Sequence, residues 1–212
     1  MRIQGANQLW TAMYVNVTTT TVSFSNAYNA SSAGTDSQLR NCIGKGGDRV
    51  FQFSSAVVDC YNCISDGEYD GTPSVGRGYE GASTATINNC IGVNATSFDF
   101  HGSATEDYNA SEDTSAAGAN SITSQVVADM FNDQTAQDYR PATSGSNQID
   151  DGVDLSGTFT ESFEPGVSHN SGASGWEMGS YDDSATPAVP GGANEYLAAH
   201  AVRLSSNRRL RM

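Results

Sequence analysis

Acidic side chains that could act in catalysis or cation binding occur in four groups along this chain of 212 residues. Paired carboxylates serve as acid and base in glycoside hydrolysis, and clustered acids bind calcium. The groups are Asp66/Glu68/Asp70, Asp99 with His101, Glu112/Asp113, and Asp150/Asp151/Asp154. Their spacing does not align an acid and a base on one face, so turn chemistry is the simpler interpretation and we expect no catalytic residues.

The first acidic group imitates the start of an EF-hand calcium loop. The twelfth position of such a loop requires a bidentate Glu, but Arg77 stands there, so the calcium interpretation fails at its most discriminating residue. We expect instead an acidic, Gly-rich loop over residues 65–83 that projects outwards. Its tyrosines, Tyr69 and Tyr79, are candidates for contact with a protein or a glycan.

The four cysteines could in principle form disulfides or bind a metal. Cys60 and Cys63 form a C-x-x-C pair, whereas the other two cysteines stand alone and the three histidines are scattered. Structural zinc sites need paired ligands at defined spacing, so we expect neither a metal nor another cofactor.

Three of the cysteines lie in a repeated tripeptide, Asn-Cys-Ile. The copies are 21 and 27 residues apart, and each is preceded by an apolar residue two places before its Asn. Short strands recurring at this interval indicate a solenoid in which successive coils stack. We therefore expect a buried Asn column bonded from coil to coil, with Cys and Ile filling the interior and the cysteines free. This structural ladder comprises Asn41, Cys42, Ile43, Asn62, Cys63, Ile64, Asn89, Cys90 and Ile91.

Composition narrows the class of protein further. Only 37% of the residues are hydrophobic and the formal net charge is −14, while Gly numbers 22. A helical bundle is excluded because strong helix formers are scarce, and nucleic acid is an unfavourable partner for so acidic a body. No signal peptide and no apolar run long enough for a membrane span are visible. The sign of the charge reverses at the end of the chain, at Arg203, Arg208, Arg209 and Arg211.

The repeats and the segment after them resemble right-handed parallel β-helix repeat proteins, which have the pectate-lyase-like superfamily architecture and also occur among phage virion proteins. The residues that carry the resemblance beyond the repeats are Asp138-Tyr139, Gly145-Ser146, Ile149-Asp150, Gly152, Asp154, 164–166 and 176–181. Asn147 departs from the family's closing motif, where a proline is expected, as do Met178 and Ser180. The resemblance implies an all-β fold, namely a short right-handed parallel β-helix with a C-terminal cap and a short helical, basic tail.

The chain divides into four expected parts. Residues 1–22, which include Trp10, form an N-terminal cap or docking arm, and residues 23–135 form the coils. Residues 136–183 form the C-terminal cap. Residues 184–212 form a linker, a short helix and an Arg-rich tail.

The function expected from this organisation is structural. We expect a non-catalytic virion protein made in the host cytoplasm, most readily a capsid decoration protein of a phage. Its partners would be other virion proteins and copies of itself, with a trimer as one option, and neither nucleic acid nor membrane. The contact candidates are Trp10, Tyr69, Tyr79 and the four terminal arginines. The alternatives are a phage tail fibre or spike, or a β-helix protein that binds or cleaves polysaccharide.

Overall fold

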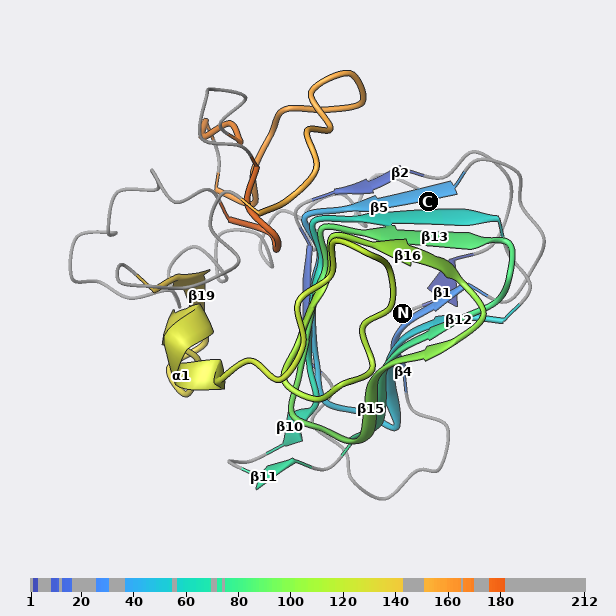
Figure 1. The fold of residues 1–212 in the computed structure, drawn as a ribbon, viewed down its shortest axis with the longest axis vertical. Coiled ribbons are helices and arrows are strands. Elements are labelled where there is room, and N and C mark those ends of the chain that lie inside the picture. Colours follow the sequence, from blue (N-terminus) through green and yellow to red (C-terminus); the bar gives the residue numbers. More distant parts are fainter. Residues whose placement is uncertain are drawn as a thin grey trace, which may run out of the picture.

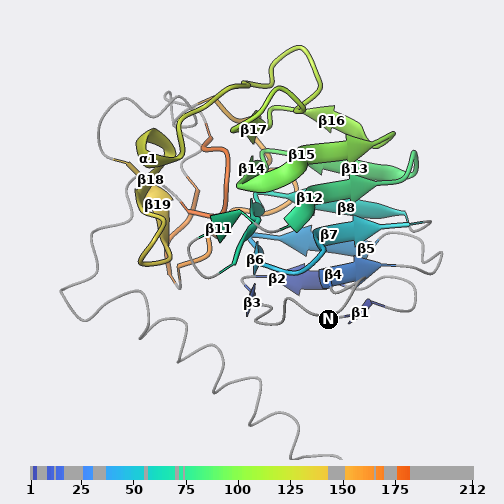
Figure 2. The same ribbon diagram turned by 90° about the horizontal axis from the view of Figure 1, so that it is seen from below.

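Three parallel sheets form the main body in the computed structural model. The structure describes residues 2–3, 9–11, 13–16, 26–30, 37–54, 57–69, 72–73, 75–142, 151–164, 166–169 and 176–181. The chain passes from one sheet to the next and then repeats the circuit, so that each circuit stacks on the one before (Figures 1 and 2). This arrangement is a parallel β-solenoid, as the repeats predict.

Each sheet contains five described strands, and each strand pairs with its equivalent in the neighbouring coil, on both sides except at the two edges of the sheet. The first sheet contains β1 (Arg2–Ile3), β4 (Asn26–Ala30), β7 (Arg49–Phe53), β12 (Val75–Gly81) and β15 (Ala95–Gly102). The second contains β2 (Leu9–Thr11), β5 (Ser37–Arg40), β8 (Val58–Tyr61), β13 (Ala85–Asn88) and β16 (Thr105–Asp107). The third contains β3 (Tyr14–Asn16), β6 (Ile43–Lys45), β9 (Ile64–Asp66), β14 (Ile91–Val93) and β17 (Ala110–Ser111).

The N-terminal segment is part of the solenoid. Strands β1, β2 and β3 pair in parallel with β4, β5 and β6, so the described parts of residues 1–22 build the first coil. The expectation of a separate cap or docking arm is therefore wrong for these parts. Pairing with the next coil satisfies backbone groups that an isolated arm would expose to water.

The opposite end of the stack is covered by the residues that follow β17. Ile122 forms a parallel bridge with Ala110, and Ser111 donates its backbone N–H to the carbonyl of Ile122. Ala116 packs against the interior cluster. Residues 112–126 therefore cover this end. Figure 1 shows them as a yellow-green loop that crosses the last coil.

The remaining described residues lie along the side of the solenoid. They include α1 (Val127–Met130) and an antiparallel pair, β18 (Phe131–Asp133) with β19 (Asp138–Pro141). Figure 2 shows this part beside the stacked coils rather than over their end. We call the described residues among 127–181 the side segment. Those of them that fall in the cap expected from residues 136–183 pack beside the coils instead of over their end, which corrects that expectation. No described helix is long and apolar enough to cross a membrane.

Candidate functional site

The asparagines of the repeat make the corners between the second and third sheets. Asn41, Asn62 and Asn89 have φ of 52°, 51° and 55°, and each is fully buried. Among residues with a Cβ, Asn adopts this left-handed region most readily because its short side chain can bond locally. The corner therefore explains why the same residue recurs at this place in each coil.

The side chains of these asparagines bond mainly to the side segment. They donate to the backbone carbonyls of Glu161, Glu177 and Val153 over 2.5, 3.2 and 2.8 Å. Among the described asparagines of the column, one coil-to-coil bond is present, from Asn89 to Asn62 over 3.4 Å. The expected column exists, but its main partner is a distant part of the chain.

The cysteines face the interior, as expected, and all four are buried thiols that form no disulfide. The backbone N–H of Cys42 donates to the sulfur of Cys63, and the N–H of Cys63 donates to the sulfur of Cys90, both over 3.4 Å. The sulfur of Cys60 lies 3.9 Å from that of Cys90. The stacked thiols thus accept bonds from the coil below them while filling the core.

The isoleucines point the other way, which corrects the expectation that they fill the interior. Ile43, Ile64 and Ile91 are buried in a second cluster, outside the solenoid, whose other members include Phe131, Tyr139, Phe163 and Met178 of the side segment. Gly179 has φ of +95°, and a Cβ there would lie 2.7 Å from Ile91. The side segment therefore packs closely on the outer face of the third sheet.

A fourth copy of the corner is present but carries different residues. Ala110 pairs with Ile91, which places Tyr108 at the Asn position and Asn109 at the Cys position. Tyr108 has φ of 55°, and the side chain of Asn109 accepts from the N–H of Cys90 and donates to the carbonyl of Ile87. The same tripeptide, Tyr-Asn-Ala, occurs at residues 28–30, but there it lies inside strand β4 and makes no corner.

Tyr79 lies in the core, and this corrects its assignment as a contact residue. It is fully buried in β12 and stacks between Phe51 and Phe100, with ring centroids 4.8 and 4.7 Å apart. Tyr28 continues the stack at 4.6 Å from Phe51. The expected outward loop over residues 65–83 is therefore partly wrong: β9 and β12 belong to the coils, and β10 (Glu68–Tyr69) with β11 (Thr72–Pro73) forms a short hairpin between them.

A signal for this aromatic column exists in the sequence. Each member is followed by a polar residue and then by Ala, Phe or Gly, in segments 28–30, 51–53, 79–81 and 100–102. Its members are 23, 28 and 21 residues apart, close to the spacings of 21 and 27 residues in the Asn-Cys-Ile repeat. The variable third residue conceals the pattern.

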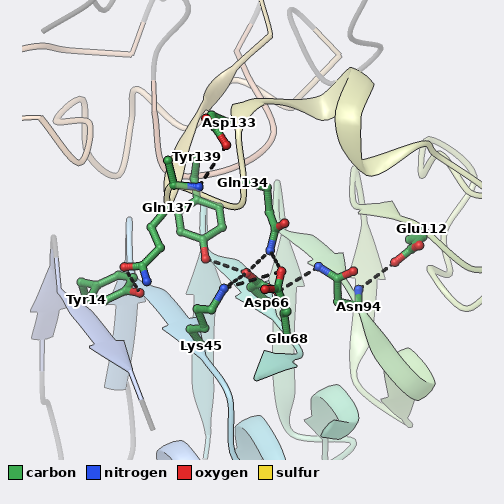
Figure 3. Close-up of polar contacts among 11 residues, drawn as sticks. Tyr14, Lys45, Asp66, Glu68, Asn94, Glu112, Asp133, Gln134, Gln137 and Tyr139 are labelled. Carbon is green, nitrogen blue, oxygen red and sulfur yellow. Dashed lines mark hydrogen bonds and ion pairs between the residues drawn. The ribbon is translucent and has the colours of Figure 1, made fainter. Parts of the chain in front are cut away.

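The best-defined polar site surrounds Asp66 at the end of β9 (Figure 3). This carboxylate is fully buried and forms an ion pair with Lys45 at 3.0 Å. It also accepts from the hydroxyl of Tyr139 and the amide of Gln134, each over 2.6 Å, and from the amide of Asn94 over 2.9 Å. Gln134 makes a further short bond to Glu68. Burial, and next the charge of Asp66, raises the pKa of Tyr139 well above its usual value.

This arrangement fits a structural clamp. The donors around Asp66 come from β6, from the turn after β14 and from the side segment, so the carboxylate joins two neighbouring coils to the chain that covers them. With its oxygens so engaged, Asp66 is not presented to a substrate or a calcium ion as an EF-hand ligand would be.

Asp99 occupies a second buried site, at the end of the stack. Its carboxylate accepts backbone N–H bonds from Glu112 and Asp113 over 2.9 and 3.1 Å. Burial is the main cause that raises the pKa of Asp99 to about 7, and the charges of Asp113 and Glu112 add to it. His101, its candidate partner, instead lies with Phe98, at 5.2 Å between ring centroids. The described contacts thus assign Asp99 to the turn that covers the last coil.

Partly exposed side chains of a different kind gather at the outer surface of the first sheet. Glu80 forms ion pairs with Arg77, at 2.9 Å, and with Arg49. Phe98 is 45% exposed and pairs in register with Arg77 of the neighbouring strand. We call Arg49, Arg77, Glu80, Phe98 and His101 the outer patch. It combines an exposed ring with fixed charges, and the sequence interpretation missed it because these residues lie in different coils.

The other expected contact residues are placed only in part. Trp10 lies in β2 and Tyr69 in β10, and their side chains are outside the described structure. The four terminal arginines, the linker and the short helix also lie outside the described residues. Of the acidic group Asp150/Asp151/Asp154, Asp150 also lies outside the described residues. Asp154 is exposed, and its carboxylate accepts a hydrogen bond from the backbone N–H of Ser156.

Comparisons of the chain with protein-family models, with curated proteins and with solved structures find no significant match. The class of the protein therefore follows from its own fold. It is a parallel β-solenoid with a laterally packed side segment, buried polar sites and an outer patch.

Proposed function

We propose that this protein is a non-catalytic structural protein of a virion, and within the virion a capsid decoration protein of a phage. A non-catalytic role is supported by the buried carboxylates, which bond within the fold. Asp66 and Asp99 are both enclosed and accept several bonds from neighbouring coils and turns. A catalytic carboxylate must instead reach a substrate, within hydrogen-bonding distance of the proton it transfers.

The virion setting is supported by the sequence resemblance and by the charge of the chain end. A basic terminus on an acidic body suits docking on an acidic neighbour, including another copy of the chain. In this role, residues 193–212 would attach the protein and the solenoid would supply rigidity.

Recovery of the native protein with particles would test the virion proposal. Antibodies raised against the full chain would follow it through density-gradient purification of particles from a lysate of the source culture. We expect it to sediment with DNA-filled particles and to be accessible to antibody on their surface. Recovery only in particle-free fractions would contradict the proposal.

Removal of residues 193–212 tests the attachment role separately. We expect the shortened chain to keep its circular dichroism spectrum and melting temperature but to lose binding to particles that lack the protein. A matched variant that replaces the four terminal arginines by Gln should lose binding as well. Unchanged particle binding by both variants would remove the assigned role of this end.

A polysaccharide-binding function is the second candidate, and the outer patch favours it. An exposed aromatic ring provides a stacking surface, and the adjacent arginines and Glu80 can bond to hydroxyl groups. A glycan array probed with the wild type and with Phe98→Ala would test it. Binding that is lost in the variant would support this candidate, and the release of reducing ends or unsaturated products that depends on Asp99 or Asp150 would contradict the non-catalytic assignment.

A further inference from the structure

The interior of the solenoid contains three thiols in a compact group. The sulfur atoms of Cys60, Cys63 and Cys90 all lie within 4.8 Å of one another, and those of Cys60 and Cys90 are 3.9 Å apart. Cys60 and Cys63 flank the corner of one coil, and Cys90 lies in the next coil. The spacing of Cys42 and Cys90 along the chain is not that of a zinc motif, but stacking of the coils brings distant cysteines together regardless of spacing.

The geometry matches a three-coordinate thiolate site. Metal–sulfur bonds of about 2.3 Å at trigonal angles require sulfur atoms about 4.0 Å apart. The separation of Cys60 and Cys90 already has this value, and the upper limit of 4.8 Å for the group leaves the others within a small side-chain adjustment.

Two of the three sulfur atoms already act as hydrogen-bond acceptors. Cys63 and Cys90 each accept a backbone N–H bond from the preceding coil. All three cysteines are fully buried, so a cation bound here would be enclosed by the coils and must displace the thiol protons.

We propose that Cys60, Cys63 and Cys90 form a binding site for a single Cu(I) ion. Soft thiolate ligands select Cu(I), whereas zinc in structural sites takes four ligands, and the three sulfur atoms form the complete set that the described residues bring together here. Binding converts three thiols and one Cu(I) into a tris-thiolate complex and releases three protons, with no change of oxidation state. The ion would join two successive coils from inside, which goes beyond the proposed structural role and does not depend on it.

Refolding of the full chain with Cu(I) tests the site, because buried thiols are best loaded as the coils form. The reduced protein is refolded without oxygen in the presence of Cu(I), and a chromogenic Cu(I) chelator then removes weakly bound ion. We expect one Cu(I) per chain to be retained and the melting temperature to rise. Cys60→Ala and Cys90→Ala should each weaken retention by more than about tenfold, since even outer partners of metal ligands change affinity by roughly 10–100-fold.

Cys42→Ala is the matched control, because Cys42 is also a buried cysteine of the column but lies outside the group of three. It should retain Cu(I) as the wild type does. X-ray absorption of the loaded wild type does not depend on any variant folding, and we expect one shell of three sulfur atoms. Failure of the wild type to retain Cu(I), a shell containing nitrogen or oxygen, or equal loss of Cu(I) in Cys42→Ala would overturn the proposal.

Discussion

At the scale of the residue, the three members of the repeated tripeptide perform three different tasks. In the third coil, Asn62 makes the left-handed corner, Cys63 fills the interior, and Ile64 packs outward against the side segment. Three consecutive side chains thus connect the inside of the solenoid, its corner and its covered flank. A substitution at each position should therefore disturb a different contact.

The corner at Asn62 can be tested by a pair of substitutions. Asn62→Ala should lose the bond to Glu177 and also strain a backbone with φ of 51°. Asn62→Gly should lose the bond but relieve the strain, so that Ala destabilises the fold by about 1–2 kcal/mol more than Gly. Urea unfolding of both variants measures this difference. Equal destabilisation would show that the corner does not select for the left-handed conformation.

Replacement of Lys45 tests the structural clamp around Asp66. Lys45→Met would leave the Asp66 carboxylate buried without its cation, which typically costs about 3–5 kcal/mol of unfolding free energy. The double variant with Asp66→Asn removes both charges and should lose less stability than Lys45→Met alone. Chemical unfolding of the single and double variants provides the comparison, and a double variant less stable than Lys45→Met would refute the clamp.

The stability of the fold should depend on pH through Asp99. With its pKa raised to about 7 in the folded protein, mainly by burial, Asp99 ionises near pH 3.9 only in the unfolded chain. Between these pH values the folded protein binds one more proton than the unfolded chain. The contribution of Asp99 to stability is therefore full below about pH 4 and is lost as pH rises through 7. Unfolding free energies of the wild type and of Asp99→Asn across this range should show a flatter slope for the variant. Identical slopes would exclude Asp99 as the cause.

At the scale of the element, the first sheet is organised by the aromatic column that its strands contribute. Tyr28, Phe51, Tyr79 and Phe100 stack in successive strands, and the hydroxyls of Tyr28 and Tyr79 reach carbonyls of Ile43 and Ile91 across the interior. Each ring therefore fixes its coil relative to the next and also joins the first sheet to the third. Parallel pairing alone would leave the register less strongly specified.

Truncation of a central ring should be much more harmful than truncation of a surface ring. Phe51→Ala removes a fully buried ring that stacks on both faces, and we expect a loss of about 3–5 kcal/mol. Phe98→Ala, on the same sheet but 45% exposed, is the matched control and should change stability by about 0.5 kcal/mol or less. Thermal and urea unfolding measure both, and comparable losses would contradict the assigned role of the column.

At the scale of the whole molecule, the solenoid and the side segment form one folded unit. The segment covers the outward isoleucines, bonds to the Asn corners, and supplies Gln134 and Tyr139 to the buried Asp66. The third sheet would otherwise expose a row of apolar side chains to water. The segment is thus a covering layer of the solenoid, which its place after the last coil would not suggest.

Truncation of the chain after residue 126 should therefore expose the outer face of the third sheet, which carries Ile43, Ile64 and Ile91. Burial of each isoleucine contributes roughly 1.5–3 kcal/mol, and all three lose their cover together. We expect the shortened chain to bind a hydrophobic dye and to aggregate. A chain truncated after residue 183 should neither bind the dye nor aggregate. Size-exclusion chromatography and dye fluorescence make the comparison. A stable, dye-silent 1–126 fragment would contradict this account.

The sequence by itself determined the class of fold and the length of the coils. Corner asparagines and the apolar residues two places before them, such as Leu39, Cys60 and Ile87, are local signals, because each coil repeats the same turn and the same alternation. The free, inward cysteines followed from the same pattern. These features could be predicted since they depend on neighbours along the chain.

The tertiary structure alone decided what covers each face. The outward direction of Ile64, the burial of Tyr79 and the donors around Asp66 depend on residues that are distant in sequence, so no local period reveals them. The grouping of Cys63 with Cys90 has the same origin, because stacking places equivalent points of successive coils about 4.8 Å apart whatever the length of the loop between them. Contacts across coils, and between the coils and the side segment, therefore define the candidate sites of this protein.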